Sequence, residues 1–425
     1  MVQRMVGLVS LMLVFGTTQA APDAASNSSA TVTTIHAFTG GVALSSDGAN
    51  PTGILIQGQD GNLYGITRQG GVPGTIDFGS EYGKVENVSA GAVFRVSLSG
   101  SESLFVPFAV GGQFSSGGAL IQATDGNFYG VESNGLFQIT PAGNISQFFN
   151  QPTIMEDVGQ GNVVGPSVIQ ATDGNLYITT NGSNSDEGIA PEQILQVSLA
   201  GAATQFVNFG TPAEVFGAPA SLLIQGHDGN FYGFIGGQGA IVQISPAGAV
   251  KTLYAFTNDV TNGTGISSSL IQAGDGNLYG TLSAGGAPSA ACPSGCGVAY
   301  RVTPAGNFSV IYSFGSSATD GRTPSGALIQ ASDGSFYGVT AAGGTGAAQG
   351  AGFNSATCGD GCGTLYRITT TGLETVLHSF GTSPNDGVTP IGALLQASDG
   401  NVYGVTQSGG VEQLGVVFKA VLPTQ

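Results

Sequence analysis

The chain has 425 residues, of which 41% are hydrophobic and 8% are charged. Its formal net charge is -17 and its isoelectric point is about 4.1, so it repels nucleic acid and anionic lipid, and we expect neither as a partner. The 72 glycines fall at turns between apolar segments, which argues against a disordered chain and for a surface of uncharged polar residues.

The first twenty residues are typical of a secretory signal. Arg4 is followed by an apolar run over residues 5–15 and then by Thr18, Gln19 and Ala20, with small residues at the positions that a signal peptidase reads. A retained anchor is disfavoured because the run is shorter than the ~20 residues of a spanning helix. We expect a signal peptide over residues 1–20, a flexible linker over 21–31, and a secreted or periplasmic product with no membrane insertion after signal cleavage.

One stretch, Gln-x-x-Asp-Gly-Asn-x-Tyr-Gly, recurs seven times. Asp-Gly and Gly-Asn supply the positive φ angles of a tight turn, and the apolar flanks favour strands, so each copy predicts a β-hairpin. Each aspartate is interpreted as a turn residue, because a calcium loop would need several oxygen ligands. We therefore expect no metal and no cofactor. The copies are residues 57–65, 122–130, 170–178, 225–233, 272–280, 330–338 and 396–404, with Ile178 replacing a glycine and Ser335 an asparagine.

Two more apolar segments complete each unit. The third strand has the form VFRVSLSG at residues 93–100, and the fourth has the form LFVPF at residues 104–108. Seven units of four strands predict an all-β fold, a seven-bladed β-propeller over residues 32–425 as a single domain. The chain starts with a fourth-type strand at 33–38 and ends with a third-type strand at 416–421. We therefore expect the N-terminal strand to close the ring on the last blade.

The repeat resembles the GloVer tandem repeat of exported bacterial proteins. The resemblance is carried by segments such as AYRVTPAG at residues 299–306, VIYSF at 310–314 and GALIQASDGSFYG at 326–338, and it extends from residue 32 to residue 422. It implies export and a propeller-like repeat, and no particular reaction.

The loops of the predicted ring alternate between two faces. The Asp-Gly-Asn turns and the loops between third and fourth strands lie on one face, here called the turn face, and are short in every unit. The connections between second and third strands lie on the other, the variable face. They range from four residues at 132–135 to the long loops 68–91 and 341–363. Because repeat folds tolerate insertions where they bind, we expect a protein or polysaccharide partner on the variable face.

The long loop of the first unit contains a candidate binding set. Its aromatic rings could stack on a sugar whose hydroxyls its carboxylates bind, or two carboxylates could serve as acid and base in glycoside cleavage. A polar connection with two residues tucked against the blade is the competing interpretation, and the absence of tryptophan favours it. The candidates are Asp77, Phe78, Glu81, Tyr82 and Glu86.

The three histidines form no nucleophilic motif. His36 and His378 fall in fourth-type strands, where other units have tyrosine, and His227 falls in an Asp-Gly turn. There is no G-x-S-x-G element and no His beside a Cys, so nucleophilic catalysis lacks support. An exported binding or scaffolding propeller, expected to be a monomer, is preferred over an extracytoplasmic hydrolase or lyase with its site at the central opening.

The four cysteines form two matching pairs, each just before a third-type strand. In an exported protein they are interpreted as disulfides, and the repeated spacing predicts that each pair is joined locally, Cys292 to Cys296 and Cys358 to Cys362. A zinc site built from all four thiolates is the alternative.

Overall fold

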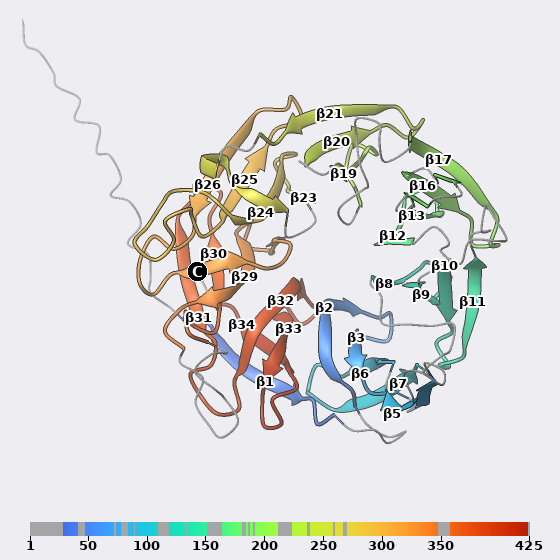
Figure 1. Ribbon diagram of the computed structural model, residues 1–425, viewed down its shortest axis with the longest axis horizontal. Coiled ribbons are helices and arrows are strands. Elements are labelled where there is room, and N and C mark those ends of the chain that lie inside the picture. The colour runs from blue at the N-terminus through green and yellow to red at the C-terminus, as the bar shows by residue number, and fades with distance from the viewer. Residues whose placement is uncertain are drawn as a thin grey trace, which may run out of the picture.

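The computed structural model is a closed ring of seven antiparallel sheets arranged radially about a central axis (Figure 1). The predicted all-β, seven-bladed propeller is confirmed. Within the described residues no helix is long and apolar enough to cross a membrane, and the helical structure is one 3-10 turn, Val260–Asn262. The structure describes residues 29–40, 47–71, 74–77, 84–88, 90–108, 119–132, 135–150, 164–180, 184–185, 188–189, 192–210, 223–235, 239–257, 260–266, 270–346 and 358–423.

Each blade has four strands, numbered outward from the ring axis. The innermost strands are β2 (Ala49–Gln57), β8 (Leu120–Gln122), β12 (Val164–Gln170), β18 (Ile224–Gln225), β23 (Ile271–Gln272), β28 (Ile329–Gln330) and β32 (Gly387–Gln396). The second strands are β3 (Leu63–Gln69), β9 (Phe128–Glu132), β13 (Leu176–Thr180), β19 (Phe231–Ile235), β24 (Leu278–Ala284), β29 (Phe336–Gly343) and β33 (Val402–Gly409).

The outer half of each blade is equally regular. The third strands are β6 (Ala92–Val96), β10 (Gly135–Ile139), β16 (Glu192–Val197), β20 (Ala240–Ile244), β25 (Val298–Val302), β30 (Thr364–Ile368) and β34 (Val416–Val421). The fourth strands are β7 (Glu102–Pro107), β11 (Ile145–Asn150), β17 (Ala203–Gly210), β21 (Val250–Ala255), β26 (Phe308–Ser313), β31 (Glu374–Ser379) and, in the seventh blade, β1 (Thr31–Ala37).

Four further segments extend this plan. Short strands β22 (Thr264–Ile266) and β27 (Gly321–Pro324) continue the inner edges of the fifth and sixth blades, pairing with β24 and β29. Two hairpins, β4 (Gly74–Asp77) with β5 (Lys84–Val88) and β14 (Asn184–Ser185) with β15 (Gly188–Ile189), are inserted between second and third strands of the first and third blades.

The core consists of seven apolar clusters, one between each pair of neighbouring blades. The glycine that ends the recurring stretch is explained by this packing. Gly65 lies beneath the ring of Phe94 on the next strand, so a Cβ atom there would strike the ring. In the third blade Ile178 faces Leu195 instead of an aromatic ring, and a side chain fits. The glycine therefore makes room for a buried aromatic residue in five blades, whereas in the fourth blade Gly233 lies opposite Val242.

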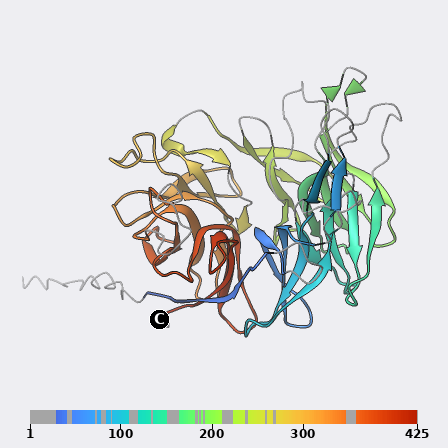
Figure 2. The ribbon, with the colours of Figure 1, turned by 60° about the horizontal axis from the view of Figure 1, so that its bottom comes forward.

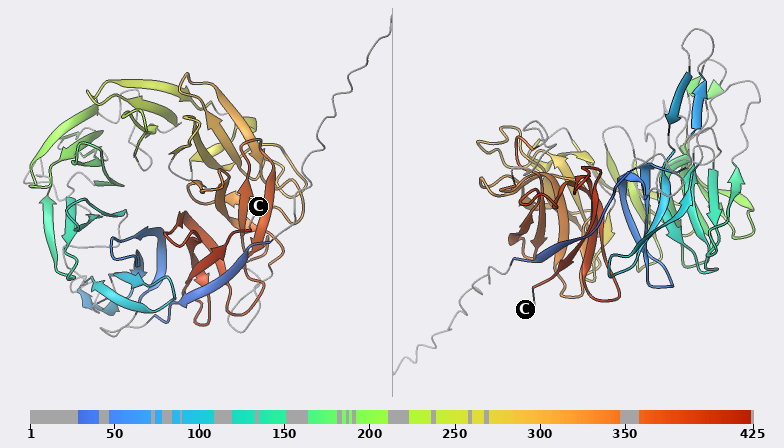
Figure 3. Two further views of the ribbon diagram at one scale, coloured as in Figure 1. Left: turned by 180° about the vertical axis from the view of Figure 1, so that it is seen from behind. Right: turned by 90° about the horizontal axis from the view of Figure 1, so that it is seen from below.

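The ring is closed as the sequence predicts. Strand β1 pairs antiparallel with β34, from Thr31 opposite Val421 to Ala37 opposite Val416, with one register shift between Thr34 and His36. Figure 3 shows this N-terminal strand along the outer edge of the C-terminal blade. The two ends of the described chain thus share one sheet.

Candidate binding face

The aspartates of the turn face are each enclosed by their own turn. Asp60 accepts hydrogen bonds from the Asn62 amide at 3.1 Å, from Asn62 Nδ2 at 2.7 Å and from the Tyr64 hydroxyl at 2.9 Å. The same pattern holds in the other six turns, where Ser335 supplies only its backbone amide. The corresponding residues are Asp125, Asp173, Asp228, Asp275, Asp333 and Asp399, with the tyrosines 129, 177, 232, 279, 337 and 403.

These bonds set the protonation of both partners. Burial raises the pKa of Asp60, but the hydrogen bonds from Asn62 and Tyr64 outweigh it, and the net pKa is lowered. Burial, and then the hydrogen bond to Asp60, raise the pKa of Tyr64 to about 12. The carboxylate is therefore ionised and the phenol protonated at neutral pH, so neither is suited to proton transfer there. The interpretation of these aspartates as turn residues is supported.

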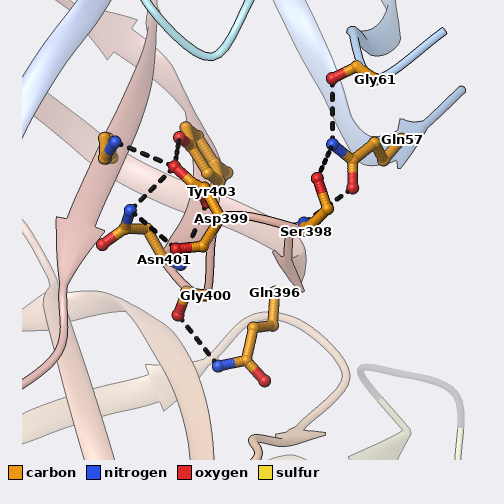
Figure 4. Close-up of polar contacts among 9 residues, drawn as sticks. Gln57, Gly61, Gln396, Ser398, Asp399, Gly400, Asn401 and Tyr403 are labelled. Atoms are coloured by element: carbon orange, nitrogen blue, oxygen red, sulfur yellow. Dashed lines mark hydrogen bonds and ion pairs between the residues drawn. The ribbon is translucent and has the colours of Figure 1, made fainter.

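The glutamines of the recurring stretch join the blades to one another. Gln57 Oε1 accepts a hydrogen bond from the Ser398 amide of the seventh blade at 2.8 Å, and its Nε2 donates to the Gly61 carbonyl and to Ser398 Oγ (Figure 4). Gln122, Gln170, Gln225, Gln272, Gln330 and Gln396 each accept from an amide of the preceding blade in the same way, at 2.6 to 2.9 Å. A closed circle of seven contacts therefore occupies the turn face.

One residue position of the third strand separates the blades into two groups. This residue lies opposite the recurring tyrosine and is cationic in four blades, namely Arg95, Arg301, Arg367 and Lys419. Lys419 Nζ lies 3.0 Å from Asp399 Oδ2, and its hydrogen bonding helps to lower the pKa of that carboxyl against the effect of burial. The second, third and fourth blades have Gln138, Gln196 and Gln243 there, which bond the tyrosine hydroxyl. The charge of the turn aspartate is thus uncompensated by this position in three adjacent blades.

The same blades that carry these cations share a second contact on the variable face. Asn50, Thr323 and Thr389, each just before a proline, have φ angles of 53°, 55° and 55°, a conformation that costs about 1–3 kcal/mol for a residue with a side chain. Their amides donate to carbonyls of the preceding blade, those of Leu414, Cys296 and Cys362 respectively. The strained residues therefore fasten the junctions 7/1, 5/6 and 6/7.

Both cysteine pairs are disulfide-bonded, Cys292 to Cys296 and Cys358 to Cys362. Both bonds close loops that reach the third strand on the variable face, and all four thiols are consumed, so the alternative of a four-thiolate zinc site does not fit. Gly295 and Gly361 have φ angles of 84° and 89° and lie against the backbone of Gly285 and Gly343. The two loops are therefore held by backbone packing as well as by the disulfides.

Two inserted hairpins project from the variable face. The pairs β4–β5 and β14–β15 stand beyond the ends of the blades, on the part of the ring formed by the first three blades (Figures 2 and 3). Of the candidate binding set, Asp77 ends β4 opposite Lys84, and Glu86 lies in β5. Phe78, Glu81 and Tyr82 lie outside the described residues. The backbone thus places two of the five candidates on a projecting hairpin.

The histidines lie where the sequence places them, and two have partners that it did not reveal. His227 is exposed on the turn face, where its amide donates to Gln272. His36 and His378 lie in β1 and β31, and their Nε2 atoms are each 3.1 Å from a carboxylate, that of Asp47 or of Asp386. Asp47 also accepts the Thr39 amide, so it bonds within its own loop as well as to the preceding strand.

Comparisons with known proteins agree with this architecture. Residues 165–356 match the Gloeobacter/Verrucomicrobia repeat family, which confirms the resemblance stated from the sequence. No curated protein sequence matches the chain.

Solved structures show similarity of fold. A catalytically inactive variant of virginiamycin B lyase from Staphylococcus aureus, solved with quinupristin, is 11% identical, with a TM-score of 0.55 over 93% of this chain and 100% of that one. The extracellular domain of a hybrid two-component system from Bacteroides thetaiotaomicron has the same identity and TM-score, over 92% of this chain and 40% of that one. At this identity the likeness concerns the propeller alone.

Proposed function

We propose that this Gloeobacter/Verrucomicrobia-repeat propeller is an exported binding or scaffolding module that takes a protein or polysaccharide partner on its variable face. One observation carries the proposal. The recurring polar groups of the turn face are used within the ring, whereas the inserted hairpins and disulfide loops all leave from the opposite face. A turn face that repeats one pattern seven times offers little asymmetry for specific recognition.

The architecture of the variable face suits a binding role. The disulfides, the strained residues before proline and the carbonyls of Cys296 and Cys362 hold loops of the fifth to seventh blades against their neighbours. Loops ordered in advance lose less conformational entropy when a partner binds. The hairpins β4–β5 and β14–β15 lie on another part of the same face. A partner that spans the ring would therefore contact both the disulfide-bonded loops and the hairpins.

Export is part of the proposal. Disulfides form and persist in oxidising compartments, and the two in this chain favour a secreted or periplasmic location. The predicted signal at residues 1–20 is consistent with that location. Cleavage of the signal is tested by N-terminal sequencing of the protein recovered from the culture medium or periplasm.

Excision of the hairpins tests the binding face. The carbonyl of Gly70 accepts the Gly91 amide at 3.0 Å, so deleting residues 72–89 leaves a closed stem. Thr180 pairs with Gln193, so residues 182–191 can be replaced by Asn-Gly as a two-residue turn. We expect both variants to fold, because surface loop length affects stability only slowly.

Binding is measured on an array of soluble and cell-wall polysaccharides, and by crosslinking to extracellular proteins of the source organism. The proposal requires that excision weaken the wild-type signal at least tenfold. The matched control is His227→Ala on the turn face, which keeps the amide bond to Gln272. Binding that is insensitive to both excisions but lost in the control variant would overturn it. Turnover of a bound polysaccharide would instead favour the alternative, a hydrolase or lyase at the central opening.

A further inference from the structure

Equivalent positions of the repeat form a polar cluster at three neighbouring blade junctions. His36, Tyr312 and His378 occupy the same place in their outer strands, opposite Val417, Ala299 and Leu365. Each contacts the aspartate of the following loop, which is Asp47, Asp320 or Asp386. The outer strand of the next blade supplies a third side chain, from the residue that pairs with the fifth residue of the third strand. This residue is Glu102 opposite Val96, Glu374 opposite Ile368, or Val32 opposite Ala420.

The junction that closes the ring therefore combines an imidazole with two carboxylates. His36, Asp47 and Glu102 each offer one ligand atom, and these atoms all lie within 4.8 Å of one another. His36 belongs to β1, Asp47 to the loop that leads into β2, and Glu102 to β7. The cluster thus joins the outer strand of the seventh blade to the first blade.

Two buried atoms of this cluster make no hydrogen bond, although His36 Nε2 forms an ion pair with Asp47 Oδ2 at 3.1 Å. His36 Nε2 and Glu102 Oε1 are buried, and neither makes a hydrogen bond within the described residues. The equivalent His378 Nε2 is also 3.1 Å from its aspartate, but there the contact is a hydrogen bond. At the same distance, the contact between His36 and Asp47 is an ion pair. A buried polar atom without a hydrogen bond is costly, so this arrangement favours the binding of an ion or a water molecule.

We propose that His36, Asp47 and Glu102 bind a divalent transition metal ion, Zn²⁺ in the first instance, at the junction that closes the ring. One imidazole nitrogen and two carboxylate oxygens are ligands that Zn²⁺ accepts, with water completing a tetrahedral set. Ca²⁺ fits poorly because it takes six to eight oxygen ligands. The contact of 3.1 Å between His36 Nε2 and Asp47 Oδ2 is close to the separation of about 3.3 Å between neighbouring ligands of a tetrahedral zinc ion.

The surroundings orient the ligands. The Thr39 amide donates to both oxygens of Asp47, at 3.1 and 2.9 Å, and the Thr39 hydroxyl donates to Oδ1 at 2.9 Å. The His36 ring packs edge-on against Phe38, with centroids 4.8 Å apart. Such outer contacts hold metal ligands in place.

Zinc uptake by the full chain tests the proposal. The protein is stripped with a chelating resin, loaded with ZnCl₂, and analysed by plasma mass spectrometry, titration calorimetry and thermal unfolding. We expect one ion per chain and a rise in Tm of about 3 °C or more at a hundredfold excess over Kd, because the ion binds the closed ring. The isosteric Glu102→Gln variant should bind at least tenfold more weakly.

The repeat supplies matched controls. His378→Gln alters the equivalent histidine at the junction of the sixth and seventh blades and should leave zinc affinity unchanged. Val32→Glu should place a third ligand beside His378 and Asp386 and raise the stoichiometry to two. Absence of uptake by the stripped chain, or uptake that Glu102→Gln does not weaken while its circular dichroism stays native, would show that the cluster is an internal ion pair and overturn the proposal.

Discussion

The side-chain oxygen of Gln57 in the first blade accepts the amide hydrogen of Ser398 in the seventh at 2.8 Å, across 341 positions of sequence. This contact is the seventh member of a circle whose other six join blades that are consecutive in the chain. The junction at which the chain ends meet therefore has the same inner contact as every other. Closure thus depends on two sets of bonds, this inner circle of glutamine contacts and the outer ladder between β1 and β34.

Removing the glutamine should weaken closure measurably. Gln57→Ala loses the bonds to the Ser398 amide, Ser398 Oγ and the Gly61 carbonyl, each worth about 0.5–1.5 kcal/mol. We expect the free energy of unfolding in urea to fall by about 1–3 kcal/mol. Ser398→Ala is the control, since it removes one exposed bond and keeps the backbone amide. Equal losses in the two variants would show that the amide contact contributes nothing.

The closing strand should contribute far more than any single bond. Deleting residues 31–38 removes the β1–β34 ladder and the contact of Phe38 with Phe94, whose ring centroids lie 5.1 Å apart. The edge of β34 would be exposed, and exposed edges promote aggregation. We expect a loss of more than about 4 kcal/mol or no cooperative unfolding. Deleting residues 21–28 should have little effect, and thermal unfolding unchanged by the strand deletion would contradict the closure.

The junction between the fifth and sixth blades should make stability depend on pH. Burial, and then the charge of Asp320, raise the pKa of Glu374 to about 8. A carboxyl whose pKa is higher in the folded state keeps its proton there after the unfolded chain has lost it, so its contribution to stability is lost as pH rises from about 4.5 to 8. Glu374→Gln should stabilise the protein at pH 8 by on the order of 2 kcal/mol and little at pH 4. The control is Glu412→Gln at an exposed position.

Most of the fold could be predicted because its determinants are local. Asp-Gly turns set each hairpin, and the leftover strands at the two ends indicate closure. The circle of glutamine contacts could not be predicted in the same way, since the acceptor of Gln57 and the donor of Ser398 meet only after the ring has closed. The sequence shows a basic residue at one position of the third strand in four blades, namely Arg95, Arg301, Arg367 and Lys419. Its role could not be predicted, because that role depends on the position of these side chains beside the turn aspartates in the folded ring.

The candidate site could be predicted in part. Loop length identified the variable face and the position of the first insertion, although not its hairpin, and the spacing of the cysteines identified the disulfides. The cluster of His36, Asp47 and Glu102 was missed because its three residues belong to different structural elements and the two outer ones are 66 positions apart. A usable signal was present, since a histidine or tyrosine in the fourth strand is followed by an Asp-Gly loop at each of the three junctions.

Each disulfide should stabilise mainly the hydrogen bond that the backbone carbonyl of its second cysteine accepts from the next blade. Each closes a loop with a sequence separation of 4, for which the loss of unfolded-state entropy is worth about 2 kcal/mol. Replacing the cysteines 358 and 362 by serine should therefore leave the ring folded. The carbonyl of Cys362 accepts the Thr389 amide at 2.9 Å, and this strained residue should exchange its hydrogen at least tenfold faster in mass-spectrometric measurements. The amide of Asn50 bonds to Leu414, in a loop that has no disulfide, and it should be unchanged. Faster exchange at both positions would indicate that the disulfide stabilises the whole ring, and unchanged exchange at Thr389 would show that the loop is held by its backbone contacts alone.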